Sequence, residues 1–283
     1  MAVKIVIDSS SDISEKEAQE LGITMIPMIV SFGEEEYFDG VNLLPDEFYE
    51  KLQASKEAPK TAQVTPFRFE EVFEKEVNAG NDVVAIVLSS RLSGTCEAAR
   101  AAASKFDGKV HVVDTMNATS GERVQMLYAL ELVKQGLSAK EIAEKLEERK
   151  NDVVAMAVVD TLEFLKKGGR VSSAAAFIGG MLSIKPVIRV VDGEVKVVAK
   201  AHGQKKGILT MKQFVKDAGG IDFNMPYCVI WGGTDSSIAE DFIDKNPDIW
   251  EGGERPHHHV ITSTVGTHVG PGAIGLVFYK KNS

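Results

Sequence analysis

Short apolar runs alternate with stretches of helical spacing along the first half of the chain. The runs with the length and composition of buried strands are 4–8, 24–32, 82–90 and 109–115. Apolar residues recur at helical intervals in 12–22, 46–53, 67–80, 95–106, 123–136 and 138–149. Because strands and helices alternate, we expect this half to form a parallel sheet flanked by helices.

The hydrophobic pattern changes after about residue 150. Two β-rich runs joined by Asp192-Gly193 predict a hairpin over 185–200, because Asp-Gly favours a type I′ turn. The other expected elements are strands at 152–160 and 227–231, a segment 162–170 that ends in a Gly-Gly turn, a helix of small apolar residues at 172–182, helices near 207–217 and 236–245, and apolar runs at 260–266 and 272–279. Hairpin and crossover connections both occur here, so we expect a mixed sheet.

The two patterns together predict an α/β fold with two domains. An N-terminal α/β domain, residues 1–152, would hold the parallel sheet flanked by helices. A C-terminal α/β domain, residues 153–283, would hold the mixed sheet.

Composition and charge narrow the class of protein. Hydrophobic residues make up 44% of the 283 and charged residues 26%, as in a soluble globular protein. The net charge of −9 argues against nucleic acid as the main partner. The chain shows no signal peptide and no window of roughly 18 apolar residues, so we expect no stable membrane insertion. The two distant cysteines, Cys96 and Cys228, fit a reducing compartment, and the expected location is the cytoplasm.

The most informative local motif is Ser93-Gly94-Thr95, between an expected strand and an expected helix. Free backbone N–H groups and the positive end of a helix dipole would favour an anion there. Ser93 could equally be an N-cap, which is the commonest role of such a serine, or a nucleophile. A nucleophile elbow is absent because Arg91 stands where its first glycine belongs, and no P-loop pattern is found.

Three other polar segments are candidates for binding. In the loop expected at 60–66, Thr61 and Thr65 could each cap the following helix. The segment 164–173 places three cations beside a Gly-Gly turn, and 265–275 is expected to be a loop with four glycines and His268. Glycines let a backbone approach another group closely, so His268 could be a hydrogen-bond donor to a ligand or a surface residue.

The tract His257-His258-His259 resembles a metal-binding sequence. It stands just before an expected strand, where alternate side chains would point apart, and neither a cysteine nor a pair of carboxylates accompanies it. We therefore expect a structural or surface role, with an adventitious metal site as the alternative. No metal and no cofactor are expected.

Several motifs together give the chain a resemblance to a known family. In chain order they are DSSSDI, KTAQVTP, SSRLSGTCEAA, VVDT, DTLEFLKKGGRVS, KPVI and VGTHVGPGAIG. This set resembles the DegV family of bacterial fatty-acid-binding proteins over almost the whole chain. The resemblance implies one long-chain fatty acid buried between two α/β domains. It also implies a carrier without catalytic activity, which presents the acid to a separate ATP-dependent fatty-acid kinase for acyl-phosphate formation in phospholipid metabolism.

The resemblance also assigns roles to single residues. Thr61 and Ser93 would hydrogen-bond the fatty-acid carboxylate, with Gly94 and His268 beside them. The residues implied in kinase docking are Arg170, His202 and Lys205. His202 stands where kinase-using members commonly carry arginine, and the helix expected at 172–182 is a candidate wall of the lipid tunnel.

Other functions remain open from the residues alone. One is a serine esterase that uses Ser93. Another is a lipid sensor or transport protein that works without a kinase. A nucleotide-binding regulator would need a phosphate loop, and the sequence contains none that we recognise.

Overall fold

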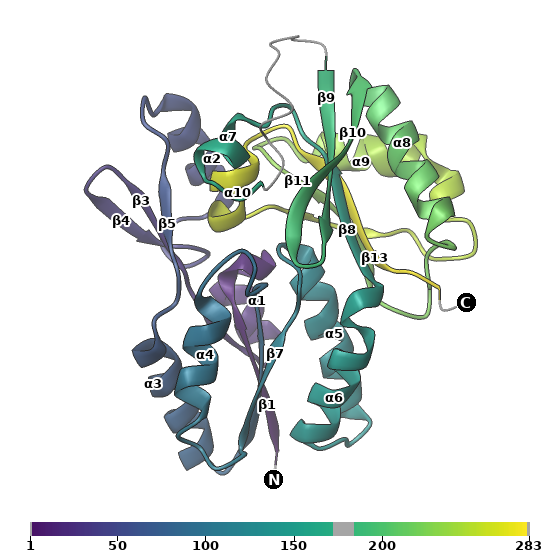
Figure 1. Cartoon of the computed structure of the whole chain (residues 1–283). Helices are drawn as coiled ribbons and strands as arrows, with labels where there is room; N and C mark the ends of the chain where they lie inside the picture. Colours follow the sequence, from purple (N-terminus) through teal and green to yellow (C-terminus); the bar gives the residue numbers. More distant parts are fainter. Residues whose placement is uncertain (1, 172–183, 282–283) are drawn as a thin grey trace.

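The computed structural model describes residues 2–171 and 184–281 (Figure 1). The helix expected at 172–182 lies outside the described residues. We call residues 2–152 the N-terminal part and the described residues from Val153 onward the C-terminal part. No helix among the described residues is long and apolar enough to cross a membrane.

The N-terminal part contains the expected parallel sheet, in the strand order β2-β1-β6-β7. Its strands are β1 (Val3–Asp8), β2 (Thr24–Ile26), β6 (Asp82–Val87) and β7 (Val110–Asp114). Its helices are α1 (Glu15–Glu20), α2 (Pro45–Ala54), α3 (Pro66–Asn78), α4 (Thr95–Ala103), α5 (Ser120–Lys134) and α6 (Ala139–Arg149), with 3₁₀ turns at Ser9–Ser11 and Lys150–Asp152.

Alternation along β6 decides which helices cover which face of this sheet (Figure 1). Val83 and Ala85 pack with the apolar residues of α3 and α4. Val84 and Ile86 point the other way and pack with those of α5 and α6. Both faces are therefore buried, which explains why the strand reads as one continuous apolar run.

The C-terminal part contains a six-stranded mixed sheet in the order β10-β9-β8-β13-β11-β12, as expected. Its strands are β8 (Val153–Val158), β9 (Ile184–Val191), β10 (Glu194–His202), β11 (Tyr227–Trp231), β12 (His257–Val260) and β13 (Ile274–Tyr279). Its helices are α7 (Glu163–Lys167), α8 (Gln204–Asp217), α9 (Ser237–Lys245) and α10 (Ser263–Val269), with a 3₁₀ turn at Pro247–Ile249. The pair β11–β12 is parallel and the other pairs are antiparallel.

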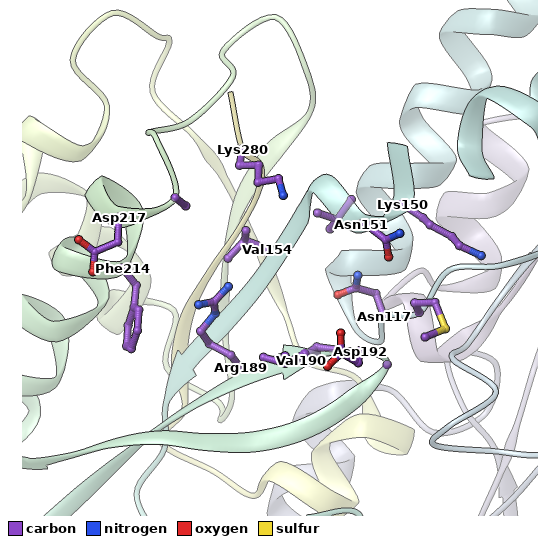
Figure 2. Close-up of a pocket in the computed structure, with 15 residues that line it drawn as sticks. Asn117, Lys150, Asn151, Val154, Arg189, Val190, Asp192, Phe214, Asp217 and Lys280 are labelled. Carbon is purple, nitrogen blue, oxygen red and sulfur yellow. The ribbon is translucent and has the colours of Figure 1, made fainter. Parts of the chain in front are cut away.

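The hairpin predicted from Asp192-Gly193 is confirmed. Both residues have positive φ, 53° and 78°, as a type I′ turn requires. The turn reaches the N-terminal part (Figure 2), where the Ser89 hydroxyl donates a hydrogen bond of 2.8 Å to the Gly193 carbonyl. Arg91 forms an ion pair of 3.1 Å with Glu194 beside it. The hairpin therefore joins the two parts and also forms one edge of its own sheet.

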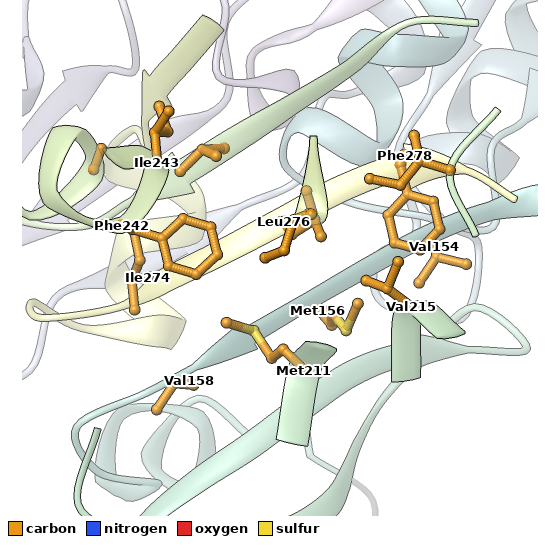
Figure 3. Packing of buried hydrophobic residues seen from close by; sticks show 14 of the residues in the cluster. Val154, Met156, Val158, Met211, Val215, Phe242, Ile243, Ile274, Leu276 and Phe278 are labelled. Atoms are coloured by element: carbon orange, nitrogen blue, oxygen red, sulfur yellow. The ribbon is translucent and has the colours of Figure 1, made fainter. Parts of the chain in front are cut away.

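The two faces of the mixed sheet have different partners. On one face, Met156 and Leu276 pack against Met211 of α8 and Phe242 of α9 (Figure 3). On the other face, Ala155, Ala157 and Ile230 pack with Val124 of α5, Leu165 of α7 and Val269 of α10. The second face is therefore the one that meets the N-terminal part.

The single strand expected at 24–32 is wrong. Its first residues form β2 in the parallel sheet, but Ile29–Phe32 form β3 in a separate antiparallel sheet with β4 (Glu35–Phe38) and β5 (Lys60–Ala62), in the order β4-β3-β5. Pro27 stands at the break, and proline lacks the N–H that a continuing ladder needs. The loop expected at 60–66 therefore begins with a strand.

Two expectations near the C-terminus also need correction. The histidine tract lies within β12 and does not precede a strand. The loop expected at 265–275 begins inside α10, because Ser263–Val269 is helical. A short helix with one glycine and four β-branched residues has weak helical propensity, so its formation depends on its surroundings.

Buried carboxylates supply those surroundings. Asp12 Oδ1 accepts a hydrogen bond of 3.1 Å from the Thr262 amide, and Asp39 Oδ1 accepts one of 3.0 Å from the Ser263 amide. Tyr49 donates from its hydroxyl to the Ile261 carbonyl at 3.0 Å. Two carboxyl groups thus satisfy free amides at the start of α10 and join the N-terminal part to the C-terminal part.

Burial makes these carboxylates costly to ionise. It raises the pKa of Asp12 to about 6, although hydrogen bonds from Thr119 and Thr262 and the positive charge of Arg123 oppose the rise. Burial also raises the pKa of Asp39 and that of Asp8. Since the native state holds a proton on Asp12 more tightly than the unfolded chain does, this residue favours folding below pH 4. That contribution is lost as the pH rises through 6.

We predict that Asp12→Asn removes this pH dependence. The free energy of unfolding of the wild type, minus that of the variant, should fall by about 2 kcal/mol between pH 4 and pH 7, because one pKa unit corresponds to about 1.4 kcal/mol and part of the contribution is already lost at pH 4. Burial lowers the pKa values of His259 and His268, so these residues make the free energy of unfolding rise with pH. The wild type and the variant both retain them, so their contribution cancels in the difference. Urea unfolding at several pH values measures the difference. A difference that does not change with pH would contradict the assignment.

Candidate functional site

A cavity of about 210 Å³ lies between the N-terminal and C-terminal parts. We call it the polar cavity. Its lining includes five residues that the sequence singled out, from four separate segments: Thr61, Ser93, Gly94, Arg170 and His268. The remaining lining residues are Ser10, Met28, Gln63, Leu88, Leu92, Ala118, Leu165, Val195, Thr264, Val265 and Val269. The fold thus brings together residues more than 200 positions apart in the sequence.

Ser93 and Gly94 stand at the carboxyl end of β6, where the chain turns into α4. The N-cap is Gly94 and not Ser93, so the expected cap is displaced by one residue. Ser93 still takes part, since its Oγ accepts from the Thr95 amide at 3.3 Å and lies 3.0 Å from Thr95 Oγ1. Gly94 leaves room for the Gln63 side chain, because a Cβ at this position would lie 2.2 Å from the Gln63 side-chain oxygen and Gln63 would have to move.

Thr61 and His268 form a pair across the cavity. Thr61 Oγ1 lies 3.0 Å from His268 Nε2, at hydrogen-bond distance. Thr61 belongs to β5 and caps no helix. Thr65 is the N-cap residue of α3, but its side chain makes no capping bond. The pair therefore connects the small antiparallel sheet to the last turn of α10.

The His268 ring is neutral at pH 7. Burial, and then the positive charge of Arg170, lower its pKa to about 4. Its Nδ1 is buried and has no hydrogen-bond partner among the described residues. A neutral imidazole has one donor and one acceptor nitrogen, so His268 can hold Thr61 and still offer its other nitrogen.

Gly168 fixes the position of the His268 ring. A Cβ at residue 168 would lie 2.1 Å from His268 Nδ1, so any side chain there would displace the ring. Gly169 adopts φ of 67°, which favours glycine, and nothing lies near its missing Cβ. The Gly-Gly turn thus provides close approach at its first residue and backbone freedom at its second.

Arg170 lies at the exposed mouth of the polar cavity. Its guanidinium donates to the Leu92 carbonyl at 3.4 Å and to the Gly168 carbonyl at 2.7 Å. His202, the last residue of β10, and Lys205, in the first turn of α8, are exposed and do not line this cavity. Their role in docking a partner stays a prediction.

The polar cavity continues into an apolar one. A cavity of about 50 Å³ shares Ala118, Val195, Val265 and Val269 with it. The other residues of this apolar cavity are Thr119, Ala155, Met156, Ala157, Ile188, Arg189, Val190, Ile230 and Ile261. The site therefore has hydroxyl and imidazole groups at one end and aliphatic side chains at the other.

Sequence reasoning missed three polar lining residues: Ser10, Gln63 and Thr264. Ser10 follows β1 as Ser93 follows β6, and ligands often bind at the carboxyl ends of parallel strands, so its position was a usable signal. Gln63 stands two residues after Thr61 in the same motif. Thr264 lies in α10, and no local pattern indicated it.

The histidine tract contributes nothing to this site. His258 Nε2 lies 2.9 Å from Glu240 Oε1 at the surface, and its ring contacts Trp231 edge-on. Among the described residues, no group of three or more His, Cys, Asp or Glu side chains could hold a metal ion.

The arrangement suits an amphipathic anion. Neutral hydroxyl and imidazole groups can donate to a carboxylate, and each charge-assisted hydrogen bond contributes about 1.5–3 kcal/mol. The aliphatic end would cover an alkyl chain, at about 0.8 kcal/mol for each buried methylene. A fully polar ligand would leave that end unfilled.

Comparison of the sequence with known proteins identifies its relatives. The family model described as "Uncharacterised protein, DegV family" matches residues 2–281. A DegV domain-containing protein of Deinococcus radiodurans is 34% identical over 280 residues, which cover 98% of each chain.

Solved structures are similar over the same length. One is a fatty-acid-binding DegV family protein from Thermus thermophilus, which matches this chain with a TM-score of 0.90 and 30% identity. The match covers 99% of this chain and 100% of that one. DegV from Bacillus subtilis, described as a fatty acid binding protein, gives a TM-score of 0.85 and 32% identity, with 99% of this chain and 100% of that one covered. Because the family model and these relatives match almost the whole sequence, the chain belongs to the DegV family.

Proposed function

We propose that this protein binds one long-chain fatty acid and presents it to a separate kinase for acyl-phosphate formation. Thr61 and Ser93 bind the carboxylate, Gly94 and His268 lie beside it, and the alkyl chain runs into the apolar cavity. The observation that carries the proposal is the change of lining from hydroxyl and imidazole groups to aliphatic side chains. The fatty-acid-binding relatives support the same ligand class.

The tail would supply most of the affinity. A chain of about 15 methylenes contributes on the order of 12 kcal/mol before the costs of binding, against a few kcal/mol from the carboxylate. The polar end would therefore decide orientation more than strength.

The contacts of Ser93 favour a carrier over an esterase. Its hydroxyl is hydrogen-bonded with Thr95, whereas the neutral His268 lies against Thr61. A serine nucleophile is normally activated by a base that accepts its own proton, and Ser93 has no such contact among the described residues.

The position of Arg170 supports presentation to a kinase. It is exposed at the mouth of the polar cavity, on the carboxylate side, where a phosphoryl group would have to arrive. Its guanidinium is held by two carbonyl groups, and a planar guanidinium can still bind a phosphate through its remaining N–H groups. His202 and Lys205 would extend this docking surface.

Lipid extraction tests the proposed function directly. The protein purified without added lipid should carry about one fatty acid of roughly 14–18 carbons per chain, because the alkyl chain leaves an apolar site slowly. Mass spectrometry of the extract gives chain length and amount. An empty protein that also fails to bind oleate or palmitate in calorimetry would contradict the proposal.

Removing the two hydroxyl groups should weaken binding without unfolding the protein. Thr61→Val and Ser93→Ala each remove one donor to the carboxylate, so each should cost about 1–3 kcal/mol of binding free energy. Calorimetric titration with oleate measures the loss, and thermal unfolding checks the fold. Thr65→Val serves as the matched control, since its hydroxyl makes no capping bond and does not line the polar cavity. Unchanged affinity in the double variant would mean that the carboxylate binds elsewhere.

Arg170→Ala should separate binding from delivery. We expect oleate affinity within about 0.5 kcal/mol of the wild type, because Arg170 is exposed and solvent screens its charge. Acyl phosphate formed with ATP and the fatty-acid kinase of a related bacterium should fall at least about tenfold, since the guanidinium is lost from the docking surface. Arg91→Ala, an exposed arginine outside the polar cavity, is the control. Normal turnover with Arg170→Ala would contradict the proposed docking role of Arg170.

A further inference from the structure

A larger cleft lies between the two parts of the chain, apart from the polar cavity. It has a volume of about 470 Å³, within the range of sites for small molecules. It shares no lining residue with the polar cavity, and it adjoins the apolar cavity, with which it shares Arg189 and Val190. The N-terminal part contributes Met116, Asn117, Lys150 and Asn151. The C-terminal part contributes Val153, Val154, Arg189, Val190, Val191, Asp192, Gly193, Phe214, Asp217, Ala218 and Lys280.

Arg189 is the notable group in this cleft. It lies half-buried on β9, and its side chain makes no hydrogen bond or ion pair with residues 2–171 or 184–281; its Nε is fully buried without a partner. The guanidinium carbon lies over the Phe214 ring, 5.3 Å from the ring centroid, as in a cation–π contact. A partly desolvated charge without a partner costs free energy, so this geometry favours an added anion.

Two amides face Arg189 from the N-terminal part. Figure 2 shows Arg189 and Lys280 on one side of the cleft and Asn117 and Asn151 on the other. Asn117 is only 3% exposed, yet its side-chain amide makes no hydrogen bond with the described residues and its Oδ1 is fully buried. The Oδ1 of Asn117 is an acceptor that packs against Gly121, so the group of this side chain that can bind an oxyanion is its Nδ2 donor.

The other charged groups of the cleft already have partners. Lys280 lies 3.5 Å from Asp152, and Lys150 is paired with Glu147. Asp192 is exposed and lies 3.2 Å from Lys196, and the exposed Asp217 accepts a hydrogen bond from Gln213. Arg189 is therefore the cation that remains available to a ligand.

We propose that this cleft binds the oxyanion of a small polar molecule, a phosphate or a carboxylate group, between Arg189 and the amides of Asn117 and Asn151. A guanidinium edge matches either group with two parallel hydrogen bonds. The amides can bond to further oxygen or hydroxyl groups of the same molecule. The lining is too polar for an alkyl chain, so the ligand differs in class from a fatty acid.

Pyrophosphate and citrate are suitable probes for this site. Calorimetric titration of the full chain with each should give saturable binding by at least one of them. Pyrophosphate binding alone would assign a phosphate site and citrate binding alone a carboxylate site. Arg189→Gln should weaken the binding at least about tenfold, because a bidentate charge-assisted contact is lost.

Two further variants keep the test decisive. Asn151→Leu changes an exposed residue on the opposite wall, so it should also weaken binding, and it tests the site even if Arg189→Gln unfolds. Arg100→Gln changes an exposed arginine outside the cleft and should bind as the wild type does. Failure of both probes to bind at millimolar concentration would overturn the proposal, as would equal binding by wild type, Asn151→Leu and a folded Arg189→Gln.

Discussion

The hydrogen bonds that Asp12 and Asp39 accept from the amides at the start of α10 hold the site together. Without them, a seven-residue helix with a glycine and four β-branched residues would have weak helical propensity and little reason to form. With them, its first amides are satisfied and its direction is fixed. Its last turn then brings His268 to Thr61, so the polar cavity depends on two carboxylates that do not line it.

This anchoring has a clear electrostatic cost. Asp8, Asp12, Asp39 and Glu122 are all buried, and burial raises the pKa of each, while Arg123 is the cation that lowers the pKa of Asp12. Serine and threonine hydroxyls and backbone amides around them offset part of that cost. Such a network specifies one arrangement of the two parts, because any other arrangement would leave a buried charge without its hydrogen bonds.

The spacing of apolar residues predicted the strands, helices and turns whose structure depends on residues close by in the sequence. The strand at 82–90, with both faces buried, and the hairpin at Asp192-Gly193 follow from apolar runs and turn chemistry, and both are confirmed. The division of 24–32 between two sheets and the helix Ser263–Val269 depend on distant partners, so no local pattern could indicate them. The location of the domain boundary near residue 152 stays a prediction.

The candidate site was predictable only through the set of motifs. Ser93 alone could be a cap, an anion-binding residue or a nucleophile, and only the distant Thr61 and His268 distinguish these roles. The unpartnered Arg189 and Asn117 were not predictable at all, since their lack of partners exists only in the folded chain.

A crystal structure of the protein with a bound fatty acid tests the central claim most directly. The account predicts a carboxylate within hydrogen-bond distance of Thr61 Oγ1 and Ser93 Oγ, with the alkyl chain against Val195 and Val269. A carboxylate bound elsewhere, or an alkyl chain that leaves the apolar cavity empty, would contradict it.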